Sequence, residues 1–260
     1  MGANKKQRLG EKRYNYQGCL MKIIEYNHCR DIIIEFQDNY KAKVHANYEH
    51  FLSNIVRNPY IPSVYGVGIT GNKYKVKIDN KITKEYLTWK TMLKRCFDLK
   101  YKEKHPTYKD ATCCDEWLLF DNFYEWLHSQ ENFSSWLNGD KWAIDKDILI
   151  KGNKIYSPET CCLVPQNVNS LFLKGDSKKG NLPIGVTKTK CGYQAKCRNS
   201  FIRGKVAALG TYTTPEDAFQ AYKAYKEKII KQVAEVEHNK GNITEKCYKA
   251  MMNYIIEIND

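Results

Sequence analysis

Two stretches through which neither a helix nor a strand can continue divide this sequence of 260 residues into three parts. The first stretch, residues 58–68, contains two prolines and two glycines, which disfavour regular structure. The second, residues 174–181, is rich in lysine, glycine and serine, a composition typical of a linker. We therefore predict three domains: residues 1–70, 71–173 and 174–260, each with enough chain to bury a core.

The first part is predicted to be a small antiparallel β module. Apolar and polar residues alternate over residues 18–26 and 31–36, with the two-residue period of a strand. A turn at Asp38-Asn39 precedes a third predicted strand at residues 40–45. We expect a meander or a partly closed barrel that follows a basic arm, residues 1–13.

The second part begins with two predicted helices. Over residues 83–98 and 116–126, apolar residues recur at intervals of three and four, as on one face of a helix. The aromatic residues of the second stretch are Trp117, Phe120, Phe123 and Trp126. An aromatic stripe at this spacing is more often core than a surface for base stacking, so we expect these side chains to be buried.

A β-hairpin and a short helix are predicted to follow. Residues 142–150 are the expected first strand, 151–153 its turn and 154–156 its return. The short helix covers residues 166–173, with Pro165 placed next to its first turn.

The third part is predicted to be a three-stranded sheet followed by a long helix. Short strands at residues 183–187, 193–198 and 205–210 are separated by turns that contain glycine. A Thr-Pro pair at 214–215 supplies the cap and first residue of the helix, and a last helix is expected within 242–260. The chain as a whole is therefore predicted to be α+β.

The charge of the chain predicts a polyanionic partner. Lysine and arginine total 42 against 29 aspartate and glutamate, a formal net charge of +13. Residues 1–85 carry +7 (15 basic, 8 acidic), residues 86–172 carry −1 (11 and 12) and residues 173–260 carry +7 (16 and 9). Basic ends around a carboxylate-rich middle suit a metal-dependent nuclease, because phosphates attract Lys and Arg whereas a divalent cation needs oxygen ligands. Three ordinary domains of uneven charge are the alternative.

Targeting signals are not evident. No apolar run reaches the length of about 18 residues that spans a bilayer, and the basic start has no apolar signal core. We therefore expect no membrane contact and a cytoplasmic location.

The ten cysteines are expected to be reduced thiols or metal ligands. The pairs Cys113-Cys114 and Cys161-Cys162 raise the possibility of structural zinc. Adjacent cysteines on a strand point to opposite faces, however, and the C-x2-C spacing is missing, so packed thiols are favoured and structural zinc is not expected.

Four segments of the third part match one known family. They are Ile184-Gly-Val, Tyr193-Gln-Ala-Lys-Cys-Arg198, Ala208-Leu-Gly-Thr-Tyr and Pro215-Glu-Asp-Ala-Phe-Gln-Ala-Tyr222. Residues 184–233 thereby resemble the APETALA-type, or ethylene-response-factor-like, DNA-binding domain. The resemblance implies a three-stranded sheet packed on one helix, with the sheet lying in the major groove of DNA.

This resemblance also implies which side chains contact DNA. Thr187 and Thr189 stand where the family carries base-reading arginines, and Lys196 and Ala208 replace a Glu and a Trp, so several base readers are missing. Arg198 matches an arginine of the family and is expected to read a guanine. The full set of expected DNA-binding residues is Lys188, Lys190, Tyr193, Lys196, Arg198, Arg203 and Lys205. A solvated basic face is the alternative.

The second part carries the landmarks of another family, in that family's order. They are Trp89-Lys-Thr-Met-Leu-Lys-Arg-Cys96, Cys114-Asp-Glu-Trp117, Ile144-Asp-Lys-Asp147, Gly152-Asn153, Tyr156-Ser-Pro-Glu-Thr-Cys161 and Asn169. This order resembles the HNH-type homing endonucleases of phages that carry the same APETALA-type module. The resemblance implies a ββα-metal centre with one Mg2+ or Mn2+ ion, held by Asp145 and Asn169, with Asn153 bracing the hairpin loop.

The segment departs from the HNH pattern at the general base. None of the six histidines lies between residues 140 and 172, and Lys146 stands where the base is expected. A lysine acts as a base only in its neutral form, so Lys146 either loses its proton or contacts phosphate while a water reacts. Asp147 is the other candidate, as base or second ligand. Without the resemblance, this Asp-Lys-Asp run would be interpreted as an exposed alternation on a strand.

We therefore expect a phage or mobile-element HNH-like endonuclease that hydrolyses phosphodiester bonds of double-stranded DNA in the cytoplasm of a bacterial host. The alternative is a catalytically decayed HNH fold that binds DNA or protein, as a transcriptional regulator or as an inhibitor of a host defence protein or nucleoprotein. The residues leave the enzymatic activity, the target sequence and the oligomeric state open.

Overall fold

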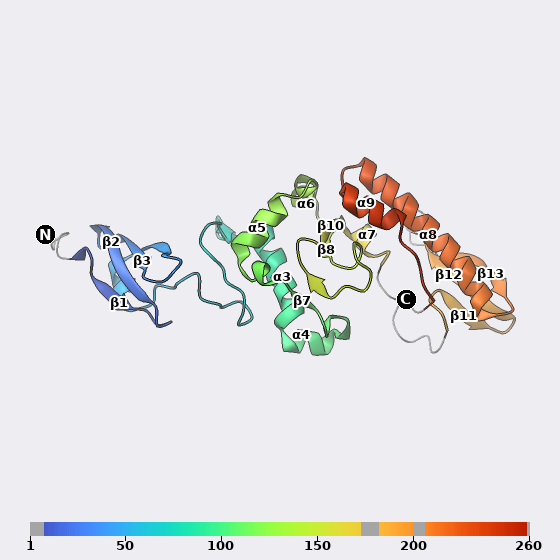
Figure 1. The fold of residues 1–260 in the computed structure, drawn as a ribbon, viewed down its shortest axis with the longest axis horizontal. Helices are drawn as coiled ribbons and strands as arrows, with labels where there is room; N and C mark the ends of the chain where they lie inside the picture. The colour runs from blue at the N-terminus through green and yellow to red at the C-terminus, as the bar shows by residue number, and fades with distance from the viewer. Residues whose placement is uncertain (1–7, 173–181, 200–205, 259–260) are drawn as a thin grey trace. The chain divides into compact units, whose positions relative to one another are not determined.

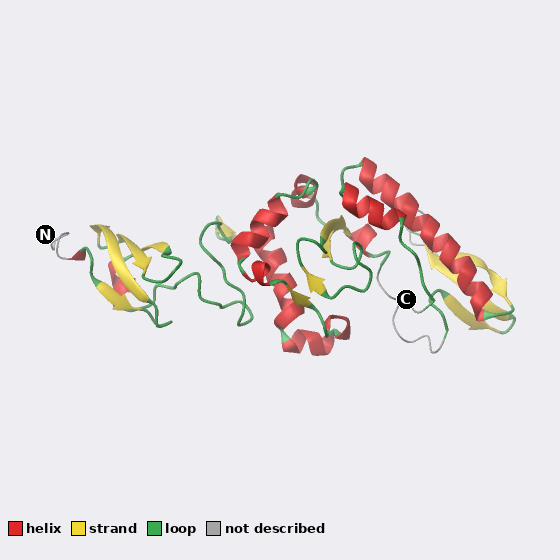
Figure 2. Cartoon of the chain, in the orientation of Figure 1, coloured by secondary structure: helices red, strands yellow, loops and turns green. Residues whose placement is uncertain are grey.

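A computed structural model describes residues 8–172, 182–199 and 206–258, which contain both helices and strands (Figure 1, Figure 2). The predicted α+β class is confirmed. The chain divides into two compact units, residues 1–125 and 126–260. The three-domain division made from the sequence stays a prediction.

The first unit begins with an antiparallel sheet of strand order β1-β2-β3-β4, coloured blue in Figure 1. Its strands are β1 (Lys12–Tyr14), β2 (Leu20–His28), β3 (Asp31–Phe36) and β4 (Lys43–Ala46). The predicted meander is confirmed, and β1 adds a strand where the basic arm was expected to end. Alternate side chains of β2 and β3 form the core with Phe51 of α2 (Tyr48–Leu52). The fully buried ones are Met21, Ile23, Ile32, Ile34 and Phe36.

Residues 58–68 form a strap that packs on the helix α3 (Lys84–Phe97). A Cβ added at Gly68 would lie 2.5 Å from Leu93 Cδ1 and 3.0 Å from the Trp89 ring, so a larger residue here would displace the Leu93 side chain. Helix α3 matches the prediction, with Thr83 as its N-cap and Asp98 as its C-cap. The short elements around it are β5 (Lys77–Ile78), β6 (Lys81–Ile82), α4 (Leu99–Lys104), η1 (Pro106–Tyr108) and β7 (Thr112–Cys113).

The single helix predicted over residues 116–126 is wrong. A 3-10 turn, η2 (Asp115–Leu118), precedes α5 (Phe120–His128), and Leu119 between them is extended, with φ −90° and ψ 121°. Ile69, the residue after the strap, pairs with the chain at this break: its N–H donates to Leu118 O (2.8 Å) and its carbonyl accepts the N–H of Phe120 (2.9 Å). Three of the four aromatic residues are buried, as expected of a core stripe: Trp117, Phe120 and Phe123. The expectation is wrong for Trp126, which is only partly buried.

The second unit contains a strand–strand–helix arrangement that differs from the predicted hairpin. Strand β8 (Trp142–Asp145) pairs with β10 (Cys162–Pro165), which leads into α7 (Gln166–Asn169). The predicted pairing of residues 142–150 with 154–156 is wrong, because β8 ends at Asp145 and its antiparallel partner lies further along the chain. The predicted return is β9 (Ile155–Tyr156), and α6 (Phe133–Asn138) precedes the arrangement.

The C-terminal sheet and helix are confirmed. Strands β11 (Val186–Thr189), β12 (Gly192–Arg198) and β13 (Val206–Tyr212) form an antiparallel sheet in that order. Helix α8 (Pro215–Asn239) starts at the N-cap Thr214, as predicted, and α9 (Glu245–Met252) follows it. Figure 1 shows α8 running along one face of this sheet. Ala195 and Cys197 of β12 are buried in one core cluster with Ala218 and Tyr222 of α8.

The end of α8 is bonded to the β8–β10–α7 region. Glu237, 5% exposed near the end of the helix, accepts a hydrogen bond from Asn167 Nδ2 of α7 (3.1 Å). Asn132, 2% exposed, donates from Nδ2 to both Leu163 O of β10 and Asn242 O beyond α8 (2.9 Å each). The strand–strand–helix arrangement is thereby fixed to the helical part of its own unit.

Candidate functional site

The end of β8 carries a buried carboxylate, which was expected to bind a metal ion. Asp145 is 8% exposed, and its Oδ1 accepts the backbone N–H groups of Asp147 (2.7 Å) and Ile148 (2.8 Å). Aspartate commonly ends a strand in this way, because its side chain satisfies the donors of the following turn. Burial raises the pKa of Asp145, although both backbone donors oppose this shift.

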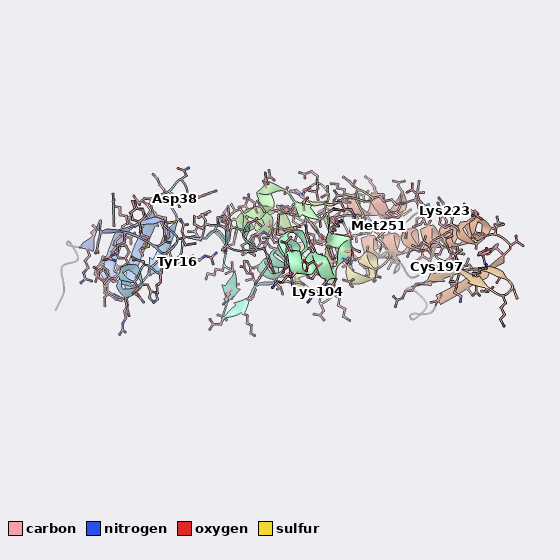
Figure 3. The ribbon with its side chains drawn as sticks, turned by 90° about the horizontal axis from the view of Figure 1, so that it is seen from below. Tyr16, Asp38, Lys104, Cys197, Lys223 and Met251 are labelled. Atoms are coloured by element: carbon pink, nitrogen blue, oxygen red, sulfur yellow. The ribbon has the colours of Figure 1, made fainter. Side chains whose placement is uncertain are left out.

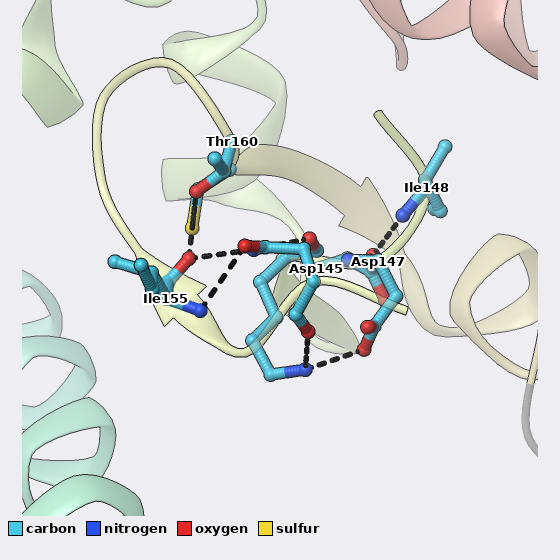
Figure 4. A network of polar contacts seen from close by, with 8 residues as sticks. Asp145, Asp147, Ile148, Ile155 and Thr160 are labelled. Atoms are coloured by element: carbon cyan, nitrogen blue, oxygen red, sulfur yellow. Dashed lines mark hydrogen bonds and ion pairs between the residues drawn. The ribbon is translucent and has the colours of Figure 1, made fainter. Parts of the chain in front are cut away.

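Lys146 and Asn153 close the loop that follows β8 (Figure 4). The Lys146 ammonium, 5% exposed as a residue, donates to Asp147 Oδ2 and to Asn153 O, both at 2.7 Å. Asn153 Nδ2 donates to Lys146 O (2.9 Å) and Ile155 O (2.7 Å), and Asn153 Oδ1 accepts the Ile155 N–H (3.2 Å). Thr160 adds a bond from its hydroxyl to Ile155 O (2.7 Å). Four of the five residues expected at the catalytic site thus meet in one hydrogen-bonded loop.

In this geometry the Lys146 side chain donates to a carboxylate and to a carbonyl. A role as general base would require a free lone pair on the same nitrogen while it keeps these two contacts. Asp147 is engaged as well, because its Oδ2 is the partner of that ammonium. The polar groups of the loop therefore satisfy one another's hydrogen-bonding capacity, as in a loop whose conformation is fixed by its internal hydrogen bonds.

Asn169, the other expected metal ligand, lies outside this network at the end of α7. Since Trp142 pairs with Pro165, helix α7 starts at the opposite end of the β8–β10 pair from Asp145. Within the described residues, no group of three or more His, Cys, Asp and Glu side chains could hold a metal ion. Carboxylate and amide oxygens suit Mg2+ and Mn2+, but an Asp145 oxygen is already taken by two backbone donors. The two expected metal ligands, Asp145 and Asn169, are therefore not brought together in one hydrogen-bonded network.

Two of the four cysteines considered for zinc, Cys113 and Cys162, contact another thiol. A hydrogen bond to Cys247, together with burial, raises the pKa of Cys162, and a bond to Cys96 with burial does the same for Cys113. Burial raises the pKa of Cys161 to about 12. Zinc is bound by thiolates, so these environments favour packed thiols.

The sheet β11–β12–β13 has a free face opposite α8. Pairing places Thr187 opposite Gln194, Gln194 opposite Thr211, Lys196 opposite Ala208 and Arg198 opposite Val206. Because strand residues alternate between faces, these side chains share the face that α8 does not cover, together with Thr189. The residues of this free face are Thr187, Thr189, Gln194, Lys196, Arg198, Val206, Ala208 and Thr211.

The free face is cationic and polar. Lys196 and Arg198, two residues apart on β12, are exposed, and about 7 Å of strand separates them. In the part of the chain that the structure describes, neither has a carboxylate partner, and no member of the free face is acidic. A bulge between Ala195 and Lys196 interrupts the register against β13, and bulges increase local twist.

The other expected DNA-binding residues are placed differently. Lys188 pairs with Tyr193, and both alternate onto the face of the sheet that carries α8. Lys190 lies in the turn between β11 and β12. Arg203 and Lys205, like the linker expected at residues 174–181, lie outside the described residues. Only Lys196 and Arg198 of the described set are therefore brought together on the free face.

Sequence reasoning missed three members of the free face: Gln194, Val206 and Thr211. The two-residue period of a strand would have assigned Gln194 to the same side as Lys196 and Arg198. Thr211 could not be assigned in that way, because the bulge against β12 shifts the alternation within β13 by one residue.

Across residues 8–172, 182–199 and 206–258, no helix combines the length and the apolar character that crossing a membrane requires. Comparison with protein-family models, with curated proteins and with solved structures finds no match to this chain.

Proposed function

We propose that this protein binds double-stranded DNA through the free face of the sheet β11–β12–β13. The observation that carries the proposal is that Lys196 and Arg198 lie on the same exposed face, whose described residues include no carboxylate. Lysine and arginine bind phosphates, and the hydroxyl and amide side chains beside them add hydrogen bonds to backbone or bases. An arginine can contact the O6 and N7 of a guanine, and β structure can enter the major groove, so we expect Arg198 to read a guanine.

The proposal is tested by the salt dependence of DNA binding. Each phosphate contact contributes about 0.9 to the slope of log K against log salt concentration. The double variant Lys196→Ala/Arg198→Ala should bind a duplex more weakly and with a slope lower by about two. The matched control is Lys228→Ala/Lys231→Ala, which removes the same charge from exposed positions of α8. Equal slopes for the two double variants would remove the sheet from the DNA interface.

Hydrolysis of the bound DNA is the second candidate function. The order β8, β10, α7, with a carboxylate at the end of the first strand, favours it, because this is the order of elements in a ββα centre. The engaged state of Asp145, Lys146 and Asp147 speaks against a preformed centre and favours the decayed fold, which binds without cleaving.

Cleavage of supercoiled plasmid in Mg2+ and in Mn2+ decides between these two. Asp145→Asn keeps an oxygen that accepts the two backbone N–H groups, so it removes the charge while sparing the turn. Cleavage by the natural chain that is lost in Asp145→Asn and in Asn169→Ala, with duplex affinity unchanged, would support hydrolysis. Binding without cleavage in either metal would leave DNA binding as the function, with inhibition or regulation of another protein as its extension.

A further inference from the structure

A pocket of about 330 Å³ opens on the first unit, far along the chain from the sheet β11–β12–β13. The side chains that line it include Lys43, His45, Arg57, Pro59, Thr70 and Asn72. Among the described residues, none that lines this pocket carries a carboxylate. Its volume lies at the lower end of the range of about 300 to 1,000 Å³ for small-ligand sites.

Among the described residues, no carboxylate forms an ion pair with Arg57 of this pocket. Its guanidinium donates to two hydroxyl groups, those of Ser63 and of Thr70, the latter at 3.2 Å. Hydroxyl groups orient the guanidinium but carry no negative charge, so its remaining donors favour an anion.

Lys43 keeps its charge available as well. Glu35 stands opposite it across the β3–β4 pair, but among the described residues Lys43 forms no ion pair with Glu35 or with another carboxylate. His45, the third basic group, has Nδ1 3.6 Å from Asp31 Oδ1. Arg57 and Lys43 are therefore the two groups that make the pocket attractive to a phosphate.

An exposed aromatic ring adjoins the pocket. Tyr40 stacks on Tyr60, with ring centroids 4.3 Å apart and planes 9° from parallel. Tyr40 is nevertheless 57% exposed, so the face of its ring turned away from Tyr60 is open. The Tyr60 hydroxyl donates to Asn72 Oδ1 (3.0 Å), and Asn72 Nδ2 donates to Lys43 O (3.2 Å), which joins the ring pair to the pocket lining.

We propose that this site binds one nucleotide of a single-stranded nucleic acid, with its base stacked on Tyr40 and its phosphate between Lys43 and Arg57. An open aromatic face beside a cationic groove is the arrangement that holds unpaired bases. A base inside a duplex presents only its edges and cannot lie on a tyrosine ring. This site is separate from the proposed duplex contact in both residues and ligand.

The test is the affinity for a fluorescein-labelled oligo-dT strand, measured by fluorescence anisotropy with the full chain. Tyr40→Ala should weaken binding about tenfold, whereas Tyr40→Phe, which keeps the ring, should bind as the natural chain does. The control is Tyr16→Ala, which removes another exposed tyrosine (65% exposed) in the turn between β1 and β2. Figure 3 labels Tyr16, and it labels Asp38 in the turn between β3 and β4.

The phosphate contact has its own readout. Lys43→Ala should lower the salt slope for oligo-dT by about 0.7, the value for one contact with a single strand. Lys12→Ala, at an exposed lysine of β1, should leave that slope unchanged. Both effects should persist in the Lys196→Ala/Arg198→Ala chain, so failure here is distinct from failure of the proposed duplex contact.

Two results would overturn the proposal. The first is oligo-dT binding by Tyr40→Ala as tight as that by Tyr16→Ala. The second is an equal loss of duplex and oligo-dT affinity in Tyr40→Ala, because a site that stacks unpaired bases should not contribute to duplex binding.

Discussion

Replacing Asp147 should destabilise the second unit more than replacing its ion-pair partner Lys146. The two side chains are held together at 2.7 Å but differ in exposure, at 7% for the lysine and 42% for the aspartate. Removing one member of a buried pair costs most when the charge left behind cannot reach water. The asymmetry of exposure therefore predicts an asymmetry of the two unfolding free energies.

The size of each effect depends on the charged group that is left without its partner in the variant. Asp147→Ala leaves a buried ammonium with Asn153 O as its acceptor among the described residues, and we expect a loss of about 2–3 kcal/mol. Lys146→Met keeps an apolar stem near the Tyr156 ring and leaves a carboxylate that water can hydrate. We expect it to cost about 1 kcal/mol, chiefly for the donor lost at Asn153 O.

Urea unfolding followed by tryptophan fluorescence measures both values, since Trp136 and Trp142 report on the second unit. Lys154→Met is the control, because Lys154 is exposed in the same loop, and it should change stability by less than about 0.5 kcal/mol. A Lys146→Met variant as unstable as Asp147→Ala, or more so, would refute the argument from exposure.

Three further predictions concern the same unit. Burial raises the pKa of Asp145, so its contribution to stability is present when the carboxyl is protonated and is lost as the pH rises from about 4 through the raised value. Asp145→Asn should gain stability relative to the natural chain over that range of pH. The measurement is the urea midpoint of both chains at several pH values, and a difference between the two midpoints that does not change with pH would contradict this prediction. Gly185→Ala should destabilise the sheet by more than about 1 kcal/mol, because φ is +77° and a Cβ would lie 2.1 Å from the Tyr222 ring; an unchanged melting temperature would show that the ring moves freely. Asn132→Leu should cost about 1–3 kcal/mol by leaving Leu163 O without its donor, and an unchanged urea midpoint would mean that this bond adds nothing.

Local sequence patterns were sufficient to predict an element where that segment alone determines its structure. The N-cap Thr214 and Pro215 predict the start of α8, and the apolar residues that follow them lie on the buried side of the helix. The alternation in residues 31–36 likewise predicts β3, whose buried and partly exposed residues alternate without exception.

Prediction from the sequence was wrong where a contact with a distant segment determines the local structure. Leu119 lies in a helical pattern, yet its extended backbone bridges to Ile69, fifty residues earlier in the chain. The partner of β8 is β10 and not the nearer β9 segment, because a side-chain bond at Asp145 ends the strand. Neither contact has a signature within a short window, since each depends on which segments meet in the folded unit.

In the candidate site, too, the features that depend on one strand could be predicted from the sequence, and those that depend on folded geometry could not. Periodicity places Lys196 and Arg198 together on β12, and the structure has them on one face. The loop around Asp145 could be located but not its internal bonding, because the number of donors that reach one carboxylate depends on backbone geometry. Lys188 was grouped with Lys196 by charge, although its register against Tyr193 turns it to the other side of the sheet.

Helix α8 also acts as a spacer. Tyr222 packs behind the sheet, and Glu237, later on the same helix, holds α7 through Asn167. At 1.5 Å per residue these two positions lie about 22 Å apart along the helix axis, which is the length of six to seven base pairs at about 3.4 Å each. Because a helix does not stretch, whatever the sheet contacts and whatever lies at α7 keep a fixed offset. Each residue inserted into α8 would change that offset by about 1.5 Å, less than half the rise of one base pair, and would turn α7 about the axis by about 100°.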